Sequence, residues 1–248
     1  DNLYYVGAGN VASWAIDTGE SIVLVDALNN DQQAQQYILN GLSALGLGDK
    51  PVSHLLISHG HGDHYGGFGL IKSVYNPRIM MSEIEWHVLE NDAFASYRWG
   101  AKPEKDLLIE DGDVLNINGT ELAFHVTPGH TPGTLTVVFP VSDGDKKHRA
   151  VLWGGTGLNY GPDVARIKSY TDSANAMKKV VKEQNIDVFL SNHPGRDGTR
   201  EKLEALSIRK ENQAHPFVQG QGVVVEAFEV LENCTRAQWM RIEENRSQ

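Results

Sequence analysis

Three histidines and an aspartate fall within six consecutive residues of this chain, His59-Gly60-His61-Gly62-Asp63-His64. Imidazole nitrogens and carboxylate oxygens are ligands that Zn²⁺ accepts, and the two intervening glycines allow the backbone to turn sharply. A regular strand would place His59, His61 and Asp63 on one face and His64 on the other. All four side chains can therefore serve one site only from an irregular loop at the end of the apolar run 52–58. The motif favours a metal-dependent hydrolase.

Two further histidines directly follow predicted strands and are the other candidate ligands. His130 lies in Thr-Pro-Gly-His-Thr-Pro-Gly at 127–133, where prolines and glycines fix a loop that would otherwise be soft. His193 lies in Ser-Asn-His-Pro at 191–194. Either histidine alone would be an ordinary loop residue, but the upstream cluster makes both of them candidates for completing a metal site.

The pattern of apolar residues predicts two β-rich halves, each followed by helices. Strands are expected at 3–6, 11–17, 21–26, 52–58, 78–81, 114–117, 121–127, 134–141, 150–153 and 186–191. Helices are expected at 31–45, around 70–74, and at 82–94, 169–183, 199–210 and 235–244. We therefore predict an α/β fold, an αββα sandwich of two mixed β-sheets with helices on both outer faces.

Composition limits the classes of protein that the chain can represent. Its 248 residues are 40% hydrophobic and no low-complexity linker divides them, so we expect one domain over 1–248. The net charge of −10 argues against nucleic acid as the main partner, which leaves a small-molecule substrate. No apolar run approaches the ~20 residues of a membrane span. The single cysteine, Cys234, excludes an internal disulfide framework.

The sequence begins at Asp1 without a methionine. We expect a secreted or periplasmic protein if a signal peptide was removed before this residue, and a cytoplasmic protein otherwise. Composition does not choose between the two compartments, and it does not set the oligomeric state.

Nearly the whole chain resembles the metallo-β-lactamase superfamily. The matching motifs are Asn2-Leu-Tyr-Tyr-Val-Gly, Val23-Leu-Val-Asp26, the His-x-His-x-Asp-His loop, Gly129-His-Thr-Pro-Gly133, Gly154-Gly155 and Asn192-His-Pro194. The resemblance implies a metallo-β-lactamase fold that binds two Zn²⁺ ions. The implied ligands are His59, His61 and His130 for one ion and Asp63, His64 and His193 for the other. It also implies that Asp63 orients a metal-bound hydroxide for attack on a carbonyl, and that Asp26 fixes the histidine loop as a hydrogen-bond acceptor.

The stretch 154–157 helps to decide which branch of this superfamily the chain resembles. Thioesterase-like, lactonase-like and nuclease-like members usually carry a metal-bridging aspartate after the strand equivalent to 150–153, where this chain has Gly-Gly-Thr-Gly at 154–157. The β-lactamases lack that bridge too, and the chain looks most like the third subclass of class B. That subclass commonly grips the substrate carboxylate with a serine-rich stretch near Thr156, which is absent here. Thr156, Asn159 and Tyr160 are candidate substrate-binding residues, with an ordinary glycine-rich turn as the alternative.

The leading hypothesis is a dizinc hydrolase that opens the β-lactam ring. A lactonase or thioesterase on the same scaffold is the alternative, because the segment 157–160 is unusual for a β-lactamase. A non-catalytic metal-binding protein is a third hypothesis, disfavoured because all six ligand positions are filled. The segment 95–105, with Tyr97 and Trp99, forms either one wall of the substrate cleft or an anchored loop.

Overall fold

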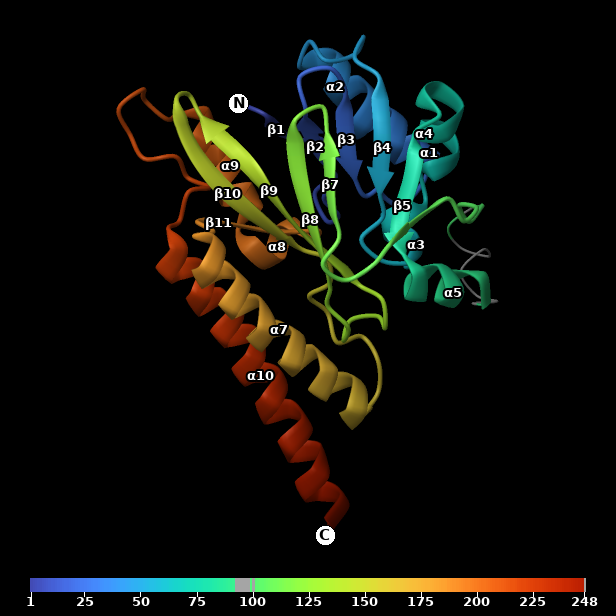
Figure 1. Ribbon diagram of the computed structural model, residues 1–248, viewed down its shortest axis with the longest axis vertical. Helices are drawn as coiled ribbons and strands as arrows, with labels where there is room; N and C mark the ends of the chain where they lie inside the picture. The colour runs from blue at the N-terminus through green and yellow to red at the C-terminus, as the bar shows by residue number, and fades with distance from the viewer. Residues whose placement is uncertain (92–98, 100, 248) are drawn as a thin grey trace.

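Two β-sheets lie between layers of helices in the computed structural model, which describes residues 1–91, 99 and 101–247 (Figure 1). One sheet has six strands in the order β1-β2-β3-β4-β5-β6, and the other has five in the order β11-β10-β9-β8-β7. Both sheets contain parallel and antiparallel pairs. The predicted αββα sandwich of two mixed sheets is confirmed.

The first sheet is built from the N-terminal part of the chain. Its strands are β1 (Leu3–Tyr5), β2 (Trp14–Asp17), β3 (Ile22–Val25), β4 (Val52–Leu56), β5 (Arg78–Ser82) and β6 (Leu107–Ile109). The first three strands pair antiparallel, and β3 to β6 pair parallel. All four residues of β3 are buried, as expected of a central strand that is covered on both faces.

The second sheet is mostly an antiparallel meander. Its strands are β7 (Val114–Ile117), β8 (Thr120–Val126), β9 (Leu135–Asp143), β10 (Lys146–Trp153) and β11 (Val188–Ser191). Asn118 and Gly119 join β7 to β8, and both have positive φ angles, 52° and 86°, as a tight two-residue hairpin turn requires. Only the last pairing, β10 with β11, is parallel.

Helices cover the outer faces of the two sheets (Figure 1). Those of the first half are α1 (Asp31–Gln33), the π-helical stretch η1 (Ala34–Leu39), α2 (Asn40–Ala44), α3 (Gly62–Tyr65), α4 (Phe68–Tyr75) and α5 (Glu83–Asn91). Those of the second half are α7 (Val164–Gln184), α8 (Pro194–Asp197), α9 (Thr199–Ser207) and α10 (Gln221–Ser247). Among the described residues, no helix combines the length and apolar character needed to cross a bilayer.

Three apolar layers hold the sandwich together. The first, which includes Leu24 and Ile38, lies between the first sheet and its helices. The second, which includes Val25 and Phe124, lies between the two sheets. The third packs residues such as Phe228 of α10 against the second sheet and α7. Each sheet therefore buries both of its faces. This explains why many of its strands are short apolar runs in the sequence and do not alternate strictly between apolar and polar residues.

The last helix is longer than the sequence predicted. The expected span was 235–244, whereas α10 begins at Gln221 and runs beside α7 (Figure 1). Gly222 and the β-branched run 223–225 have low helix propensity, and this is why the prediction was wrong there. Burial of Val224 and Phe228 in the third apolar layer supplies the stabilisation that propensity does not.

Three short elements were not predicted from the sequence: β6, α3 and α8, the last of which directly follows His193. Strand β6 adds three residues to the edge of the first sheet beside β5. Helix α3 lies inside the histidine motif, where the Gly66 N–H donates to the Gly62 carbonyl oxygen at 2.8 Å. The expectation of an irregular loop thus holds for His59 to His61, whereas Asp63 and His64 belong to a helical turn.

Hydrogen bonds between the sheets lock together the strand ends that carry the candidate ligands. The Leu135 N–H at the start of β9 donates to the Ser58 carbonyl after β4 at 2.8 Å. The Ala12 N–H ahead of β2 donates to the Asn192 carbonyl after β11 at 2.9 Å. Each bond joins one sheet to the other, so the ends of β4, β9 and β11 cannot shift independently.

A buried carboxylate, Glu85 on α5, ties two of the glycine-containing loops to each other. Its Oε1 accepts the Gly60 N–H at 2.9 Å, and its Oε2 accepts the Gly133 N–H at 2.9 Å and the Thr131 hydroxyl at 2.8 Å. Burial raises the pKa of Glu85, and these three donors partly oppose that shift by favouring the ionised form. Glu85 therefore fixes the loop after β4 relative to the loop after β8.

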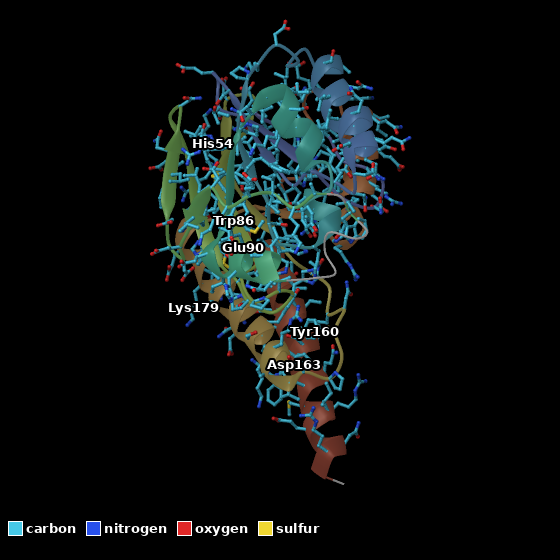
Figure 2. All side chains as sticks on the ribbon, turned by 90° about the vertical axis from the view of Figure 1, so that its right-hand side faces the viewer. His54, Trp86, Glu90, Tyr160, Asp163 and Lys179 are labelled. Carbon is cyan, nitrogen blue, oxygen red and sulfur yellow. The ribbon has the colours of Figure 1, made fainter. Side chains whose placement is uncertain are left out.

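We predict that Glu85→Gln lowers the free energy of unfolding by about 1–3 kcal/mol. The amide keeps the size of the carboxylate but has one acceptor oxygen, so its NH₂ group must face an N–H donor such as that of Gly60. Denaturant unfolding measures the change. Glu90→Gln, at an exposed position one turn along the same helix (Figure 2), is the control and should stay within about 0.5 kcal/mol of the parent. Equal stability of both variants would show that Glu85 does not hold the loops.

Candidate metal centre

Three imidazole nitrogens converge at the junction of the two sheets. His59 Nε2 lies 3.1 Å from His61 Nδ1, and His130 Nε2 lies 3.0 Å from each of these atoms. His59 and His61 come from the loop after β4, and His130 comes from the loop between β8 and β9. A zinc ion with tetrahedral bonds of roughly 2.0–2.1 Å holds its ligand atoms roughly 3.3 Å apart, close to this spacing.

The outward-facing nitrogens show why this cluster, the first triad, fits a cation. His59 Nδ1 faces the Gly154 carbonyl oxygen at 2.8 Å, and His130 Nδ1 faces the Gly157 carbonyl oxygen at 2.5 Å. A carbonyl oxygen only accepts, so each Nδ1 carries the hydrogen and each Nε2 presents a lone pair. These two Nε2 atoms lie 3.0 Å apart. Lone pairs so close repel each other unless a cation lies between them, so the donor set suits a metal ion.

A second triad lies beside the first. Asp63 Oδ2 lies 3.5 Å from His64 Nε2 and 3.8 Å from His193 Nε2. Its ligand atoms, like those of the first triad, all lie within 4.8 Å of one another. His64 Nε2 is buried without a hydrogen-bond partner among the described residues, which is costly for a polar atom unless a ligand occupies the space next to it. The structure thus brings together all six residues that the sequence singled out as ligands, in the two expected groups.

The electrostatics of the two triads differ. Burial, assisted by neighbouring histidines, lowers the pKa of His59 well below its usual value and that of His130 to about 3, so both rings are neutral. Burial would also lower the pKa of His64, but the carboxylates of Asp26 and Asp63 outweigh it and raise that pKa to about 10. Burial would raise the pKa of Asp63, but His64 and then His193 outweigh it and hold the carboxyl well below its usual range.

Asp26 holds the second triad in place. Its Oδ2 accepts from His64 Nδ1 at 2.7 Å and from the Ser58 hydroxyl at 2.9 Å, and its Oδ1 accepts the Ser58 N–H at 2.7 Å. The contact orients the ring of His64 so that Nε2 points toward Asp63. Asp26 itself has a φ of 64°, a region in which aspartate is tolerated better than most residues. His193 is held similarly, because its Nδ1 donates to the Asn10 carbonyl oxygen at 2.8 Å.

A pocket of about 300 Å³ opens across the two triads. It is bounded by His130 of the first triad and His193 of the second, and two of the three candidate substrate residues, Thr156 and Asn159, line it. The hydroxyl oxygen of Thr156 is buried without a hydrogen-bond partner among the described residues. A small molecule in this pocket can therefore reach groups from both triads at once.

Tyr160, the third candidate substrate residue, is placed differently. Its ring lies under the guanidinium of Arg166, 3.7 Å from the ring centroid, in the segment that leads into α7 (Figure 2). Arg166 in turn donates to the carbonyl oxygens of Gly129 and His130. Tyr160 is absent from the lining of the pocket and instead supports the arginine that holds the His130 loop.

There is no room for a side chain at residues 154 and 155, so neither position can carry the metal-bridging carboxylate that other members of the superfamily have after this strand. A Cβ on Gly154 would lie 1.8 Å from the Leu135 carbonyl oxygen, and one on Gly155 would lie 2.6 Å from Cβ of His130. The Gly154 carbonyl also accepts from the Asn192 amide at 2.5 Å. Residue 154 therefore contributes to the site through its backbone carbonyl, which accepts hydrogen bonds from His59 and Asn192.

Several residues that position the site were not identified from the sequence. They are Glu85, Ser58, Asn192, Arg166, Asn10 and the pocket residues Arg196 and Arg200. Asn192 belongs to the Asn-His-Pro motif at 192–194 and Ser58 directly precedes the histidine motif, whereas each of the others is a single polar residue without a motif around it.

The segment 95–105 is described only in part. Tyr97 lies outside the described residues. The Trp99 side chain lies against Gly62 so closely that a Cβ at residue 62 would be 1.8 Å from it. Gly62 is therefore required for this approach, and Trp99 packs over the histidine motif and against the first apolar layer.

Known proteins share this architecture. The family model described as the metallo-beta-lactamase superfamily matches residues 6–143. The native FEZ-1 metallo-beta-lactamase from Legionella gormanii superposes with a TM-score of 0.85 at 28% identity, covering 98% of this chain and 94% of that one. BJP-1, a subclass B3 metallo-beta-lactamase of Bradyrhizobium japonicum, gives a TM-score of 0.82 at 25% identity, covering 99% and 93%.

Curated relatives add a second kind of hydrolase. A hydroxyacylglutathione hydrolase of Francisella tularensis subsp. novicida is 25% identical over 201 residues, which cover 80% of this chain and 68% of that protein. The first curated relatives, 34–36% identical, are matched over less than half of their own length. The two histidine-rich triads are two groups of side chains that could each hold a metal ion. The chain belongs to the metallo-beta-lactamase superfamily.

Proposed function

We propose that this chain is a dizinc hydrolase that opens the β-lactam ring, with one zinc ion in each triad. The observation that carries the proposal is the pair of complete triads on one pocket, next to a glycine stretch that has no room for a bridging carboxylate. The likeness to subclass B3 enzymes over almost the full length of both chains supports the choice of substrate class.

Zinc ions held by these residues would lower the pKa of water and polarise a carbonyl group. The side chains of the protein orient the attacking water and the metal ligands. Asp63, whose side chain is 25% exposed, stays ionised because His64 and His193 lower its pKa. A carboxylate that resists protonation orients an attacking water by accepting its hydrogen bond, and it is a poor store for the proton. The neutral rings of His59 and His130 leave their Nε2 lone pairs free to act as ligands.

Lactone or thioester hydrolysis is the second candidate function. The named activity of the Francisella relative, which matches 80% of this chain, favours it, and the pocket wall lacks the serine-rich stretch expected of the third β-lactamase subclass. A non-catalytic metal-binding role is the remaining alternative. It is disfavoured because both triads are complete and open on a pocket that a small molecule can enter.

A substrate panel separates these functions. We expect the zinc-loaded protein to hydrolyse a penicillin, a cephalosporin or a carbapenem, and a chelator to abolish the reaction. Turnover of lactones or thioesters with inert β-lactams would instead establish the second candidate. Inertness toward all of them with two zinc ions bound would establish the non-catalytic role.

The residue test uses Asp63→Ala, which is expected to lower kcat by about 100-fold or more because water is no longer oriented. Asp172→Ala, at an exposed position on α7, is the matched control and should leave kcat unchanged. Equal rates for the two variants would remove Asp63 from the mechanism.

Metal binding should also release protons unequally from the two triads. His130 has a pKa of about 3 and is already deprotonated at pH 8, whereas His64, with a pKa of about 10, still carries a proton that the metal must displace. We expect the ligands of the second triad to release about one proton more than the ligands of the first triad, apart from the proton lost by metal-bound water. Calorimetric titration at pH 8 in buffers of different ionisation enthalpy measures this number.

Asp26→Asn sharpens this prediction, because it removes one of the two charges that raise the pKa of His64. Proton release on binding of the second ion should therefore fall. Asp187→Asn is the control, since Asp187 makes a similar contact with His148 in the second sheet. Equal proton release for both ions in the parent protein would contradict the assignment of the raised pKa to the second triad.

A further inference from the structure

The N-terminal half of α7 lies against the loop that carries His130. Arg166 Nε donates to the Gly129 carbonyl oxygen at 3.0 Å, and Nη2 of the same side chain donates to the carbonyl oxygen of His130 itself. Ser173 Oγ donates to the Pro128 carbonyl oxygen at 2.9 Å. Three consecutive carbonyl groups of this loop therefore accept hydrogen bonds from side chains of a single helix.

The spacing of three residues on α7 explains this contact. Arg166, Tyr170 and Ser173 occupy positions i, i+4 and i+7, so they share one face of the helix. Between the two donors, Tyr170 packs against Gly129 so closely that a Cβ atom at residue 129 would lie 2.4 Å from the Cβ of Tyr170. Gly129 also has a φ of 145°, which residues with side chains rarely adopt. The backbone of the loop is therefore shaped to fit this face of α7.

The guanidinium of Arg166 is committed to this loop. It forms no ion pair with a carboxylate in the described part of the chain, although several other arginines do. The nearest carboxylate in sequence, that of Asp163, accepts the backbone N–H of Arg166 at 3.0 Å and caps α7 instead. The ring of Tyr160, whose centroid is 3.7 Å from the guanidinium carbon, limits the movement of the guanidinium on one side (Figure 2).

Arg166 can influence the metal centre only through His130, because it does not line the pocket that opens across the two triads. The contact of His130 Nδ1 with the Gly157 carbonyl fixes the rotation of the ring, whereas Arg166 fixes the backbone from which the ring extends. The other two members of the first triad, His59 and His61, come from a different loop. The distance from His130 Nε2 to their nitrogens therefore depends on how firmly α7 holds the His130 loop.

We propose that Arg166 is a positioning residue that sets the affinity of the first triad for its metal ion, because it holds the backbone of His130 where the three imidazole nitrogens can share one ion. Tyr160 assists by holding the guanidinium in place. The second triad is held by other groups, so its affinity is independent of Arg166. The proposal rests on the proposed function only in taking zinc as the metal ion.

The test measures zinc affinity at one triad at a time, by competition with a chromophoric chelator. Asp63→Ala/His193→Ala leaves the first triad as the complete ligand set, and His59→Ala/His61→Ala leaves the second. In the first background, Arg166→Ala should weaken zinc binding by about tenfold to a hundredfold. In the second background, it should change zinc binding by less than about twofold. Unchanged affinity of the first triad, or equal weakening of both triads, would overturn the proposal.

Milder variants keep the test decisive if Arg166→Ala disturbs folding. Arg166→Lys keeps the charge but loses the planar fork that reaches two carbonyl oxygens, so it should restore part of the affinity. Tyr160→Phe keeps the ring, and the hydroxyl that it removes is buried without a partner among the described residues, so the affinity should be retained. Tyr160→Leu removes the ring and should weaken the first triad. Arg241→Ala, at an exposed position on α10, is the matched control and should leave both triads unchanged.

Because zinc affinity is measured without substrate, failure of this proposal can be told apart from failure of the hydrolytic one. If the protein hydrolyses no substrate of the panel but the affinity of the first triad still depends on Arg166, the hydrolytic function fails and the positioning role stands. If β-lactams are hydrolysed but Arg166→Ala leaves the affinity of the first triad unchanged, the positioning role is overturned and the hydrolytic function stands.

Discussion

The approach of imidazole nitrogens to within 3.0–3.1 Å of one another is the constraint on which the rest of the site depends. Such an arrangement is unfavourable in a protein alone, because neutral rings present lone pairs to each other. The chain enforces it by placing backbone carbonyl oxygens, which can only accept a hydrogen bond, next to the outer nitrogens of His59 and His130. The backbone at Gly154 and Gly157 thus decides which nitrogen of each ring is available, and the glycines allow the close approach.

The fold supplies the stiffness that this convergence needs. The six ligand residues come from three loops on two sheets, so any sliding of one sheet over the other would separate them. Hydrogen bonds across the sandwich and the buried carboxylate of Glu85 oppose that motion. Asp26 holds the second triad in place through its contact with the fully buried His64. Its own backbone adopts the left-handed conformation, which is unfavourable for most residues. Strain and buried charge are concentrated where the site is, and the apolar layers around it offset their cost.

The layer architecture and the grouping of the ligands could be predicted from the sequence, for different reasons. A buried strand such as β3 is a short apolar run, and the histidine motif places four possible metal ligands within six residues. The first half of α10 could not be predicted, because Val224 and Phe228 stabilise that helix through contacts with elements far away in sequence. The contact of the Tyr160 ring with the guanidinium of Arg166 could not be predicted either, because no local sequence pattern encodes that pairing.

Substrate choice depends on residues outside the triads. The similar proteins carry names from two kinds of hydrolase, a metallo-beta-lactamase and a hydroxyacylglutathione hydrolase, so the family match by itself leaves the acyl group undefined. Because the ligand histidines are fixed by their carbonyl and carboxylate partners, they have little freedom to adapt to one substrate or another. The walls do have that freedom. On one side Gly154 and Gly155 have no room for a side chain, and on the other side two arginines without ion pairs among the described residues stand on a corner that Asp197 anchors. In a protein of net charge −10, these two arginines place positive charge on one wall of the pocket, which favours an anion there.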